Sequence, residues 1–121
     1  SGMTIKLAVN SLFAIQVSAW GEISNLLSQS GIDQAHCLEI LTATPICSPA
    51  ATIAVKSMLS SNFAPLFPIE LVNKDLTYAM KNLSSDQAEL SLIGAAQKIY
   101  AKAIEQGYGD DNITGIVQLY Q

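Results

Sequence analysis

The sequence contains no arginine, and its six lysines are scattered singly along 121 residues that carry a net charge of −4. Binding to nucleic acid requires clustered basic groups that meet the phosphates, so we expect no nucleic-acid partner. The chain also has one histidine and only two cysteines, Cys37 and Cys47. These residues do not make up the ligand set of a structural zinc site. We therefore expect no metal, and a reduced cysteine pair in a cytoplasmic protein.

The sequence also lacks a membrane-spanning segment. The longest apolar run, LAVNSLFAIQVSAW at residues 7 to 20, has no charge, proline or glycine, but polar residues such as Asn10 and Gln16 interrupt it. A transmembrane helix needs roughly 20 predominantly apolar residues, so we expect no membrane partner. The run instead predicts a helix over residues 4 to 30 that is apolar on nearly every face and buried nearly all round.

Apolar residues make up half of the chain, whereas charged residues make up 13%. This is more apolar surface than a small monomer can bury, which predicts a second buried surface and hence a homodimer or higher oligomer. Capping residues, prolines and three- and four-residue spacing predict the later helices. We expect them over residues 34–42, 49–60, 68–85, 91–107 and 113–120. The sequence therefore predicts an all-α fold of five to six helices around one long buried N-terminal helix.

The domain organisation is expected to be simple. Residues 1 and 2, before Met3, have the composition of a scar from tag removal and are excluded from the predicted fold. Residues 3–121 are expected to form a single all-helical domain, since this length is enough for one hydrophobic core.

Two polar side chains near the start of the long helix are the first candidate site. Lys6 and Asn10 are four residues apart, which places them one turn apart on the same face of a helix. An ammonium and a carboxamide then point together from the end of a buried helix. The structural alternative is that Lys6 only extends to solvent from a core helix.

Three motifs stand in order along the chain: KLAVN at 6–10, FAPLFPIELVNKDL at 63–76 and GYGDDNIT at 107–114. Together, over residues 5–121, they resemble the C-terminal domain of the β-hydroxyacid dehydrogenases. That family includes 3-hydroxyisobutyrate dehydrogenase, tartronate semialdehyde reductase and, more distantly, 6-phosphogluconate dehydrogenase. The resemblance implies a helical C-terminal domain like that of 6-phosphogluconate dehydrogenase, within an NAD(P)-dependent oxidoreductase that acts on a 3-hydroxyacid.

The resemblance also implies roles for individual residues. The family has a lysine followed four residues later by an asparagine, so Lys6 is expected to be the catalytic acid/base and Asn10 to hold the substrate. Oxidation of a secondary alcohol requires a group that accepts the hydroxyl proton, and desolvation lowers the pKa of a buried lysine toward the working pH. Lys74 is expected to approach the nicotinamide cofactor, the alternative being an exposed lysine on a helix face. Its neighbour Asp75 is expected to have a structural role.

Other polar and aromatic residues are interpreted as structural. Glu22, on the long helix, and His36, which we expect to be partly exposed, belong to this group, as do Tyr78 and Tyr100, which we place at the edge of the core. Asn112 stands where the family usually has aspartate, and because both residues cap helices well, we expect the turn around it to survive. Ser11 likewise replaces what is often a second asparagine, and Trp20 is expected in the core or at a dimer interface.

The dinucleotide-binding fingerprint G-x-G-x-x-G is absent from the sequence. The family's Ser-Gly-Gly substrate loop, which lies in its N-terminal domain, is absent as well. We therefore expect that the N-terminal Rossmann domain is missing, that neither NAD nor NADP binds this chain alone, and that it holds at most half of an active site. Either the chain is a C-terminal domain separated from a longer enzyme, or it starts at Met3 and has lost its partner domain.

Several functions remain possible at this stage. The first is the substrate-binding and dimerising half of an NAD(P)-dependent hydroxyacid dehydrogenase, inactive in isolation. The second is a stand-alone helical self-association module without catalysis, and a third, a small-molecule carrier, depends on composition alone. The lack of arginine favours a small, non-phosphorylated hydroxyacid over 6-phosphogluconate, because arginine usually binds the phosphate of such a substrate.

Overall fold

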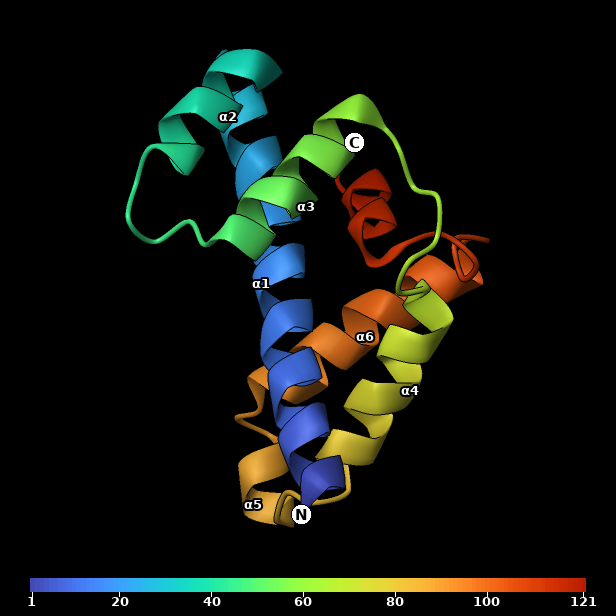
Figure 1. Ribbon diagram of the computed structural model, residues 1–121. Coiled ribbons are helices and arrows are strands. Elements are labelled where there is room, and N and C mark those ends of the chain that lie inside the picture. The colour runs from blue at the N-terminus through green and yellow to red at the C-terminus, as the bar shows by residue number, and fades with distance from the viewer.

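One long helix, α1 (Gly2–Gln29), organises the fold, and the remaining elements pack along it (Figure 1). The computed structural model describes the backbone of all 121 residues and the side chains of all except Gln34 and Ala88. The other elements are α2 (Gln34–Thr42), α3 (Pro49–Ser60), α4 (Ile69–Met80), α5 (Ser85–Ala88), α6 (Leu92–Glu105) and the 3-10 helix η1 (Ile113–Leu119). The all-α prediction is confirmed.

The helices form two groups along α1. Figure 1 shows α2, α3 and η1 near the C-terminal half of α1, and α4 and α6 beside each other along its N-terminal half. The most extensive packing joins α4 to α6, and α1 contacts five of the other elements: α2, α3, α4, α6 and η1. No helix in the described part of the chain has the length and apolar character needed to cross a bilayer.

Local sequence signals set most of the helix boundaries. Gly31 (φ 89°) and Gly107 (φ 96°) adopt the left-handed conformation just after α1 and α6, where a residue without Cβ is favoured. The side chains of Asp33, Ser48 and Ser91 cap α2, α3 and α6 by accepting a hydrogen bond from a backbone N–H of the first turn. The predicted ranges of α2 and α3 are therefore confirmed residue for residue.

The predicted end of the fourth helix is wrong. α4 ends at Met80, not at residue 85, and its last turn tightens through bonds between residues three apart. Ser84 then starts α5 with a capping box: its hydroxyl accepts from the Gln87 N–H, and the Gln87 amide accepts from the Ser84 N–H. The fourth helix ends early because the capping box at Ser84 stabilises the start of a new helix and not a further turn of α4. Pro68 is likewise the N-cap of α4 and not its first residue.

The last predicted helix is present but is a 3-10 helix. Bonds such as Gly115 N–H to the Asn112 carbonyl, at 2.7 Å, join residues three apart. The segment ITGIVQL is rich in β-branched residues, which are weak α-helix formers. It is nonetheless well buried from Ile113 to Val117, so tertiary packing compensates for its weak local preference.

The core lies where α1, α4, α6 and η1 meet. Its largest fully buried side chain is Tyr100, whose hydroxyl donates a 2.7 Å hydrogen bond to the Ala14 carbonyl of α1. The prediction that Tyr100 lies at the edge of the core is therefore wrong. Because its hydroxyl has a hydrogen-bond partner, this side chain can lie at the centre of the core. Burial raises the pKa of Tyr100 well above its ordinary value. Trp20 packs against this core, as expected.

Two expectations about α1 require correction. The helix is buried along one face only, and several of its large apolar residues are exposed, because five neighbours cannot cover a rod of 28 residues. Residues 1 and 2 do not lie outside the fold: the Ser1 hydroxyl accepts from the Thr4 N–H, and Gly2 begins the helix.

Candidate functional site

A groove between α1 and α4 brings together two of the three predicted site residues. Its volume is about 710 Å³, and both Lys6 of α1 and Lys74 of α4 line it. The other lining residues are Met3, Leu7, Leu71, Asp75, Tyr78, Lys81 and Asn82. The groove exists because α1 and α4 pack against each other and place these turns side by side.

Asn10, the third predicted residue, lies beside the groove and is linked to it by a hydrogen bond. Its side-chain N–H donates to Asp75 Oδ2 at 2.9 Å, across 65 residues of sequence. Because this bond occupies the amide nitrogen side, the Asn10 carbonyl oxygen is held in a defined orientation. Asp75 thus has a contact that fits the structural role expected of it.

The groove is positively charged, although the protein as a whole is acidic. Lys6, Lys74 and Lys81 contribute three ammonium groups, against the single carboxylate of Asp75. The ion pairs found among the described side chains lie elsewhere, at His36–Glu39 and Lys102–Glu105. Three ammonium groups without a carboxylate partner fit an anionic ligand such as a carboxylate or a phosphate.

Lys6 is exposed and not buried. This corrects the expectation of a desolvated lysine for the chain alone, because Lys6 lies on the wall of the open groove between α1 and α4. Lys74 is exposed too, on the face of α4 that forms the groove wall. Any desolvation of these amines therefore has to come from a ligand or from a further part of the protein.

Sequence reasoning did not identify two residues of the groove. Tyr78 was interpreted as a core-edge aromatic, but it is about half exposed and lines the groove, with the Lys81 ammonium 5.0 Å from its ring centre. This distance fits a cation–π contact. The signal was available: Lys74, Tyr78 and Lys81 recur at four- and three-residue spacing, which places them on one face of a helix.

The loop before α4 is held by the Gly-Asp-rich turn. The side-chain oxygen Oδ1 of Asn112 accepts from the backbone N–H groups of Leu66 and Phe67, at 3.0 and 2.9 Å. The Asn112 N–H donates to the Phe63 carbonyl, and that of Ile69, the first residue of α4, donates to the Asp111 carbonyl. The turn survives with asparagine, but this side chain anchors the loop and does not cap η1. It thereby sets where α4 begins.

Glu22, His36 and the two cysteines do not line the groove. Tyr120 donates a 3.4 Å hydrogen bond to Glu22. Burial, followed by the nearby Glu22 carboxylate and this bond, raises the pKa of Tyr120 to about 12. His36 is exposed, and Cys37 and Cys47 are free thiols. Within the described part of the chain, no three His, Cys, Asp or Glu side chains come together as metal ligands.

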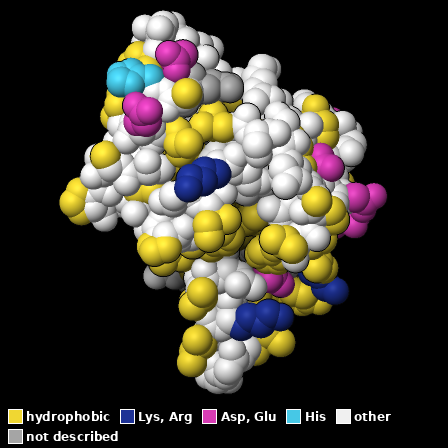
Figure 2. Space-filling view, turned by 45° about the horizontal axis from the view of Figure 1, so that its top comes forward, with side chains coloured by type: hydrophobic (Ala, Val, Ile, Leu, Met, Phe, Trp, Pro, Cys, Tyr) yellow, Lys and Arg dark blue, Asp and Glu magenta, His cyan; other side chains and the backbone are white. Residues whose placement is uncertain are grey.

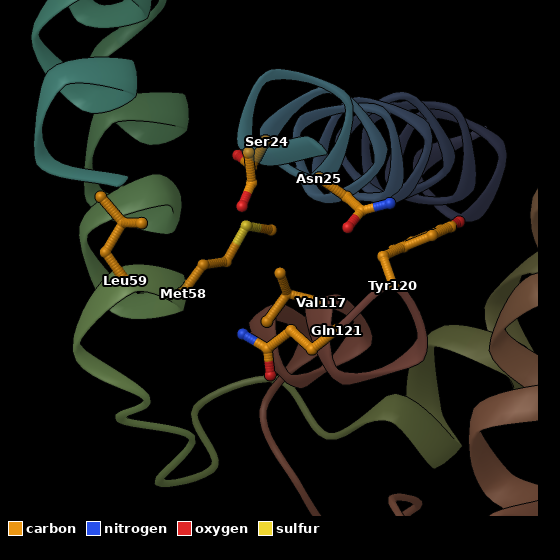
Figure 3. A pocket seen from close by; sticks show the side chains of 8 residues that line it. Ser24, Asn25, Met58, Leu59, Val117, Tyr120 and Gln121 are labelled. Carbon is orange, nitrogen blue, oxygen red and sulfur yellow. The ribbon is translucent and has the colours of Figure 1, made fainter. Parts of the chain in front are cut away.

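A second cavity, of about 370 Å³, lies between α1, α3 and η1 (Figure 3). Its lining includes Ser24 and Asn25 from α1, Met58 from α3 and Tyr120 after η1. None of the predicted site residues reaches it, and no lysine, aspartate or glutamate side chain is among its described lining residues. The groove between α1 and α4 is therefore the better candidate for an anionic ligand.

Comparisons with known proteins agree on one family. The family described as NAD-binding of NADP-dependent 3-hydroxyisobutyrate dehydrogenase matches residues 1–120. Glyoxylate/succinic semialdehyde reductase 1 of Arabidopsis thaliana is 25% identical over 118 residues, which are 98% of this chain and 41% of the reductase. Mitochondrial 3-hydroxyisobutyrate dehydrogenase of Rattus norvegicus is 26% identical over 125 residues, covering 98% of this chain and 37% of the rat protein.

A solved structure shows the same fold. Mycobacterium tuberculosis 3-hydroxyisobutyrate dehydrogenase, determined with L-serine, superposes with a TM-score of 0.82 at 23% identity, covering 97% of this chain and 42% of that one. The chain thus spans about two fifths of the length of each of these proteins.

Proposed function

We propose a function for this chain on the basis of its family. The chain belongs to the 3-hydroxyisobutyrate dehydrogenase family and is the helical C-terminal part of such a protein. In the complete protein it supplies one wall of the active site of an NAD(P)-dependent dehydrogenase acting on a small hydroxyacid. An N-terminal Rossmann domain supplies the dinucleotide-binding wall. The observation that carries the proposal is the meeting of Lys6, Lys74 and the Asn10–Asp75 pair at one groove.

The groove fits both ligands of such an enzyme. Its three ammonium groups match the carboxylate of a hydroxyacid and the phosphates of a dinucleotide. The absence of arginine favours a substrate without a phosphate, because lysine lacks the two-pronged contact that arginine makes with phosphate. A bound nicotinamide cofactor would supply the acceptor for the hydride of the substrate's carbinol carbon.

Each residue then has a defined task. The Lys6 amine accepts the substrate hydroxyl proton during oxidation and returns it during reduction. Asn10, oriented by Asp75, presents its carbonyl oxygen to a substrate hydroxyl, and Lys74 contacts the cofactor. Because Lys6 is exposed in this chain, closure of the Rossmann domain over the groove is the step that excludes water and desolvates the amine.

The test is turnover by the complete two-domain protein. Lys6→Ala is expected to lower kcat by at least about 100-fold, the usual contribution of a general acid/base, with little change in cofactor affinity. Lys74→Ala is expected to weaken cofactor binding more than it lowers kcat. Lys56→Ala, which changes an exposed lysine of α3 away from the groove, is the matched control. Near-normal turnover by Lys6→Ala refutes the assignment.

Self-association is the other part of the proposal. The apolar surface left uncovered on α1 supports a homodimer or higher oligomer. The same surface supports a second candidate function, a helical association module without catalysis. Turnover separates the two, since the module predicts none in any complete form of the protein. The free thiols of Cys37 and Cys47 favour a reducing, cytoplasmic location.

A further inference from the structure

A third hollow of the molecule differs from the groove in its chemistry. It has a volume of about 340 Å³ and lies where α1 meets the end of α4 and the start of α6. Its lining residues are Thr4, Leu7, Ala8, Ser11, Leu12, Ile15, Ala79, Asn82 and Ile93. None of these residues is charged, and most are apolar. This hollow, called here the apolar pocket, therefore fits a neutral molecule and not an anion.

One face of α1 forms most of the apolar pocket. The lining residues that α1 supplies recur at spacings of three and four, which places them on the same side of the helix. Leu7 and Asn82 line both this pocket and the groove, so the two hollows are neighbours. Leu12, on the wall of the pocket, is 59% exposed. Figure 2 shows hydrophobic side chains at the surface in the narrow lower part of the molecule, where Figure 1 places the start of α1. Apolar surface near the start of α1 is therefore open to a ligand.

Ser11, in the wall of the apolar pocket, is a buried hydroxyl without a partner. The residue is only 2% exposed, and its Oγ makes no hydrogen bond to any described residue. Two other serines of α1 differ from it: Ser18 and Ser24 donate to main-chain carbonyls three and four residues earlier, at 3.0 and 2.8 Å. A buried hydroxyl that makes no hydrogen bond destabilises the fold. Ser11 therefore indicates a hydrogen-bonding partner that is not part of the chain.

The surroundings of Ser11 determine which partner suits it. An ordered water needs at least about two polar partners. The other polar side chains of the pocket, Thr4 and Asn82, are exposed and already bonded, to the Ser1 hydroxyl and the Tyr78 carbonyl. The rest of the wall is apolar. An organic molecule with an apolar body and a single hydroxyl or carbonyl group can cover this wall and also supply the hydrogen bond.

We propose that the apolar pocket is a binding site for a small neutral organic molecule, such as an alcohol, whose polar group bonds Ser11. The apolar body of the ligand packs against Leu7, Leu12 and Ile93. A serine hydroxyl both donates and accepts, so it can bond a hydroxyl or a carbonyl group. The volume of the pocket is in the range of about 300–1,000 Å³ that is usual for small-molecule sites. This site is additional to the groove and does not depend on the function proposed for the groove.

Titration of the whole chain with phenol and with toluene tests the role of Ser11. The two probes have nearly the same size and shape, but only phenol has a hydroxyl. Both are expected to shift the amide NMR signals of Ser11 and Ile93 until the signals saturate. Ser11→Ala should raise the dissociation constant of phenol about 3- to 10-fold, the effect of one lost hydrogen bond, and should leave that of toluene within about 2-fold. Equal changes for the two probes, or no change for phenol, overturn the proposal.

A second variant tests where the probes bind. Ala8 is exposed and lines the pocket, so Ala8→Phe should obstruct it and weaken the binding of both probes at least about 10-fold. The control is Ala19→Phe, at an exposed alanine of α1 that does not line the pocket, which should leave binding unchanged. Binding that Ala8→Phe does not weaken, or the absence of saturable binding, overturns the proposal. So do shifts of the same signals when the chain is concentrated without a probe, because a second copy then covers the pocket. Turnover of the Lys6 variant tests the groove separately.

Discussion

A chain of three hydrogen bonds that joins the start of η1 to α3 and to the loop after α3 allows one substitution to be predicted in detail. Asn112 Nδ2 donates to the Thr114 hydroxyl at 3.0 Å, Thr114 and Ser57 share a 2.9 Å bond, and Ser57 donates to the Asn62 carbonyl at 2.6 Å. Since a carbonyl only accepts, the Ser57 hydrogen goes to Asn62. Thr114 must then donate to Ser57 and accept from Asn112. The chain therefore needs a donor at position 112.

Asn112→Asp removes that donor while conserving size. An ionised carboxylate supplies no hydrogen, so two hydrogens remain for three contacts, and one contact is lost however the hydroxyls turn. One lost hydrogen bond costs about 1 kcal/mol, and a buried acceptor left without a donor adds about 1–3 kcal/mol. The backbone N–H groups of Leu66 and Phe67 bind a carboxylate more strongly than an amide, which offsets part of this loss. We expect a net destabilisation of about 1–2 kcal/mol.

Urea unfolding measures this change. With a slope of about 1–3 kcal/mol/M, the midpoint for Asn112→Asp should fall by roughly 0.3–2 M. The loss should shrink on acidification, because a protonated carboxyl supplies the missing hydrogen and is therefore favoured in the folded state. Gln121→Glu, at an exposed amide, is the control for added charge and should change stability by less than about 0.5 kcal/mol. An unchanged midpoint for Asn112→Asp, at any pH, contradicts the inferred direction of the bonds.

Three further predictions concern stability. Tyr100→Phe removes the buried phenol bond to α1 and should cost about 1 kcal/mol in urea unfolding, whereas a gain contradicts it. Gly115→Ala places a Cβ only 2.9 Å from Asp111 Cβ and should cost about 1–3 kcal/mol, but Gly2→Ala, which meets nothing within 4 Å, should not destabilise the fold. Tyr120 has a pKa raised to about 12, so its stabilising contribution is complete below pH about 10 and is lost as pH rises through about 12. Unfolding titrations from pH 8 to 12 should therefore show a fall that Tyr120→Phe makes smaller, and an identical fall in both proteins contradicts this.

Local interactions explain why much of the fold was predictable. The starts of α2, α3 and α6 follow from side chains that cap the helix within three residues. Where prediction was wrong, two local tendencies competed, as at Ser84, whose capping box ended the fourth helix early. At the C-terminal segment, packing held a weak helix former in a 3-10 helix. Helix boundaries can thus be predicted from the sequence where a single capping residue is present and no second helix start competes with it.

The candidate site could be predicted only in part. Lys6 and Asn10 are one turn apart, so their common helix face follows from the sequence, and the KDL motif directed attention to Lys74. Tyr78 and Lys81 share the helix face of Lys74, but nothing local indicates that this face meets α1. The catalytic and binding roles of the three predicted residues stay predictions until turnover is measured.

The sequence by itself determined the helical class, the capped helix boundaries and the face shared by Lys6 and Asn10, because each depends on residues a turn or less apart. Only the tertiary structure decided that Asn10 bonds Asp75 across 65 residues and that the lysines of α1 and α4 share a groove. It also decided that Lys6 and several large apolar residues of α1, such as Ile5 and Val9, are exposed. These features depend on which faces the helices bury against each other, and burial is a property of the whole chain.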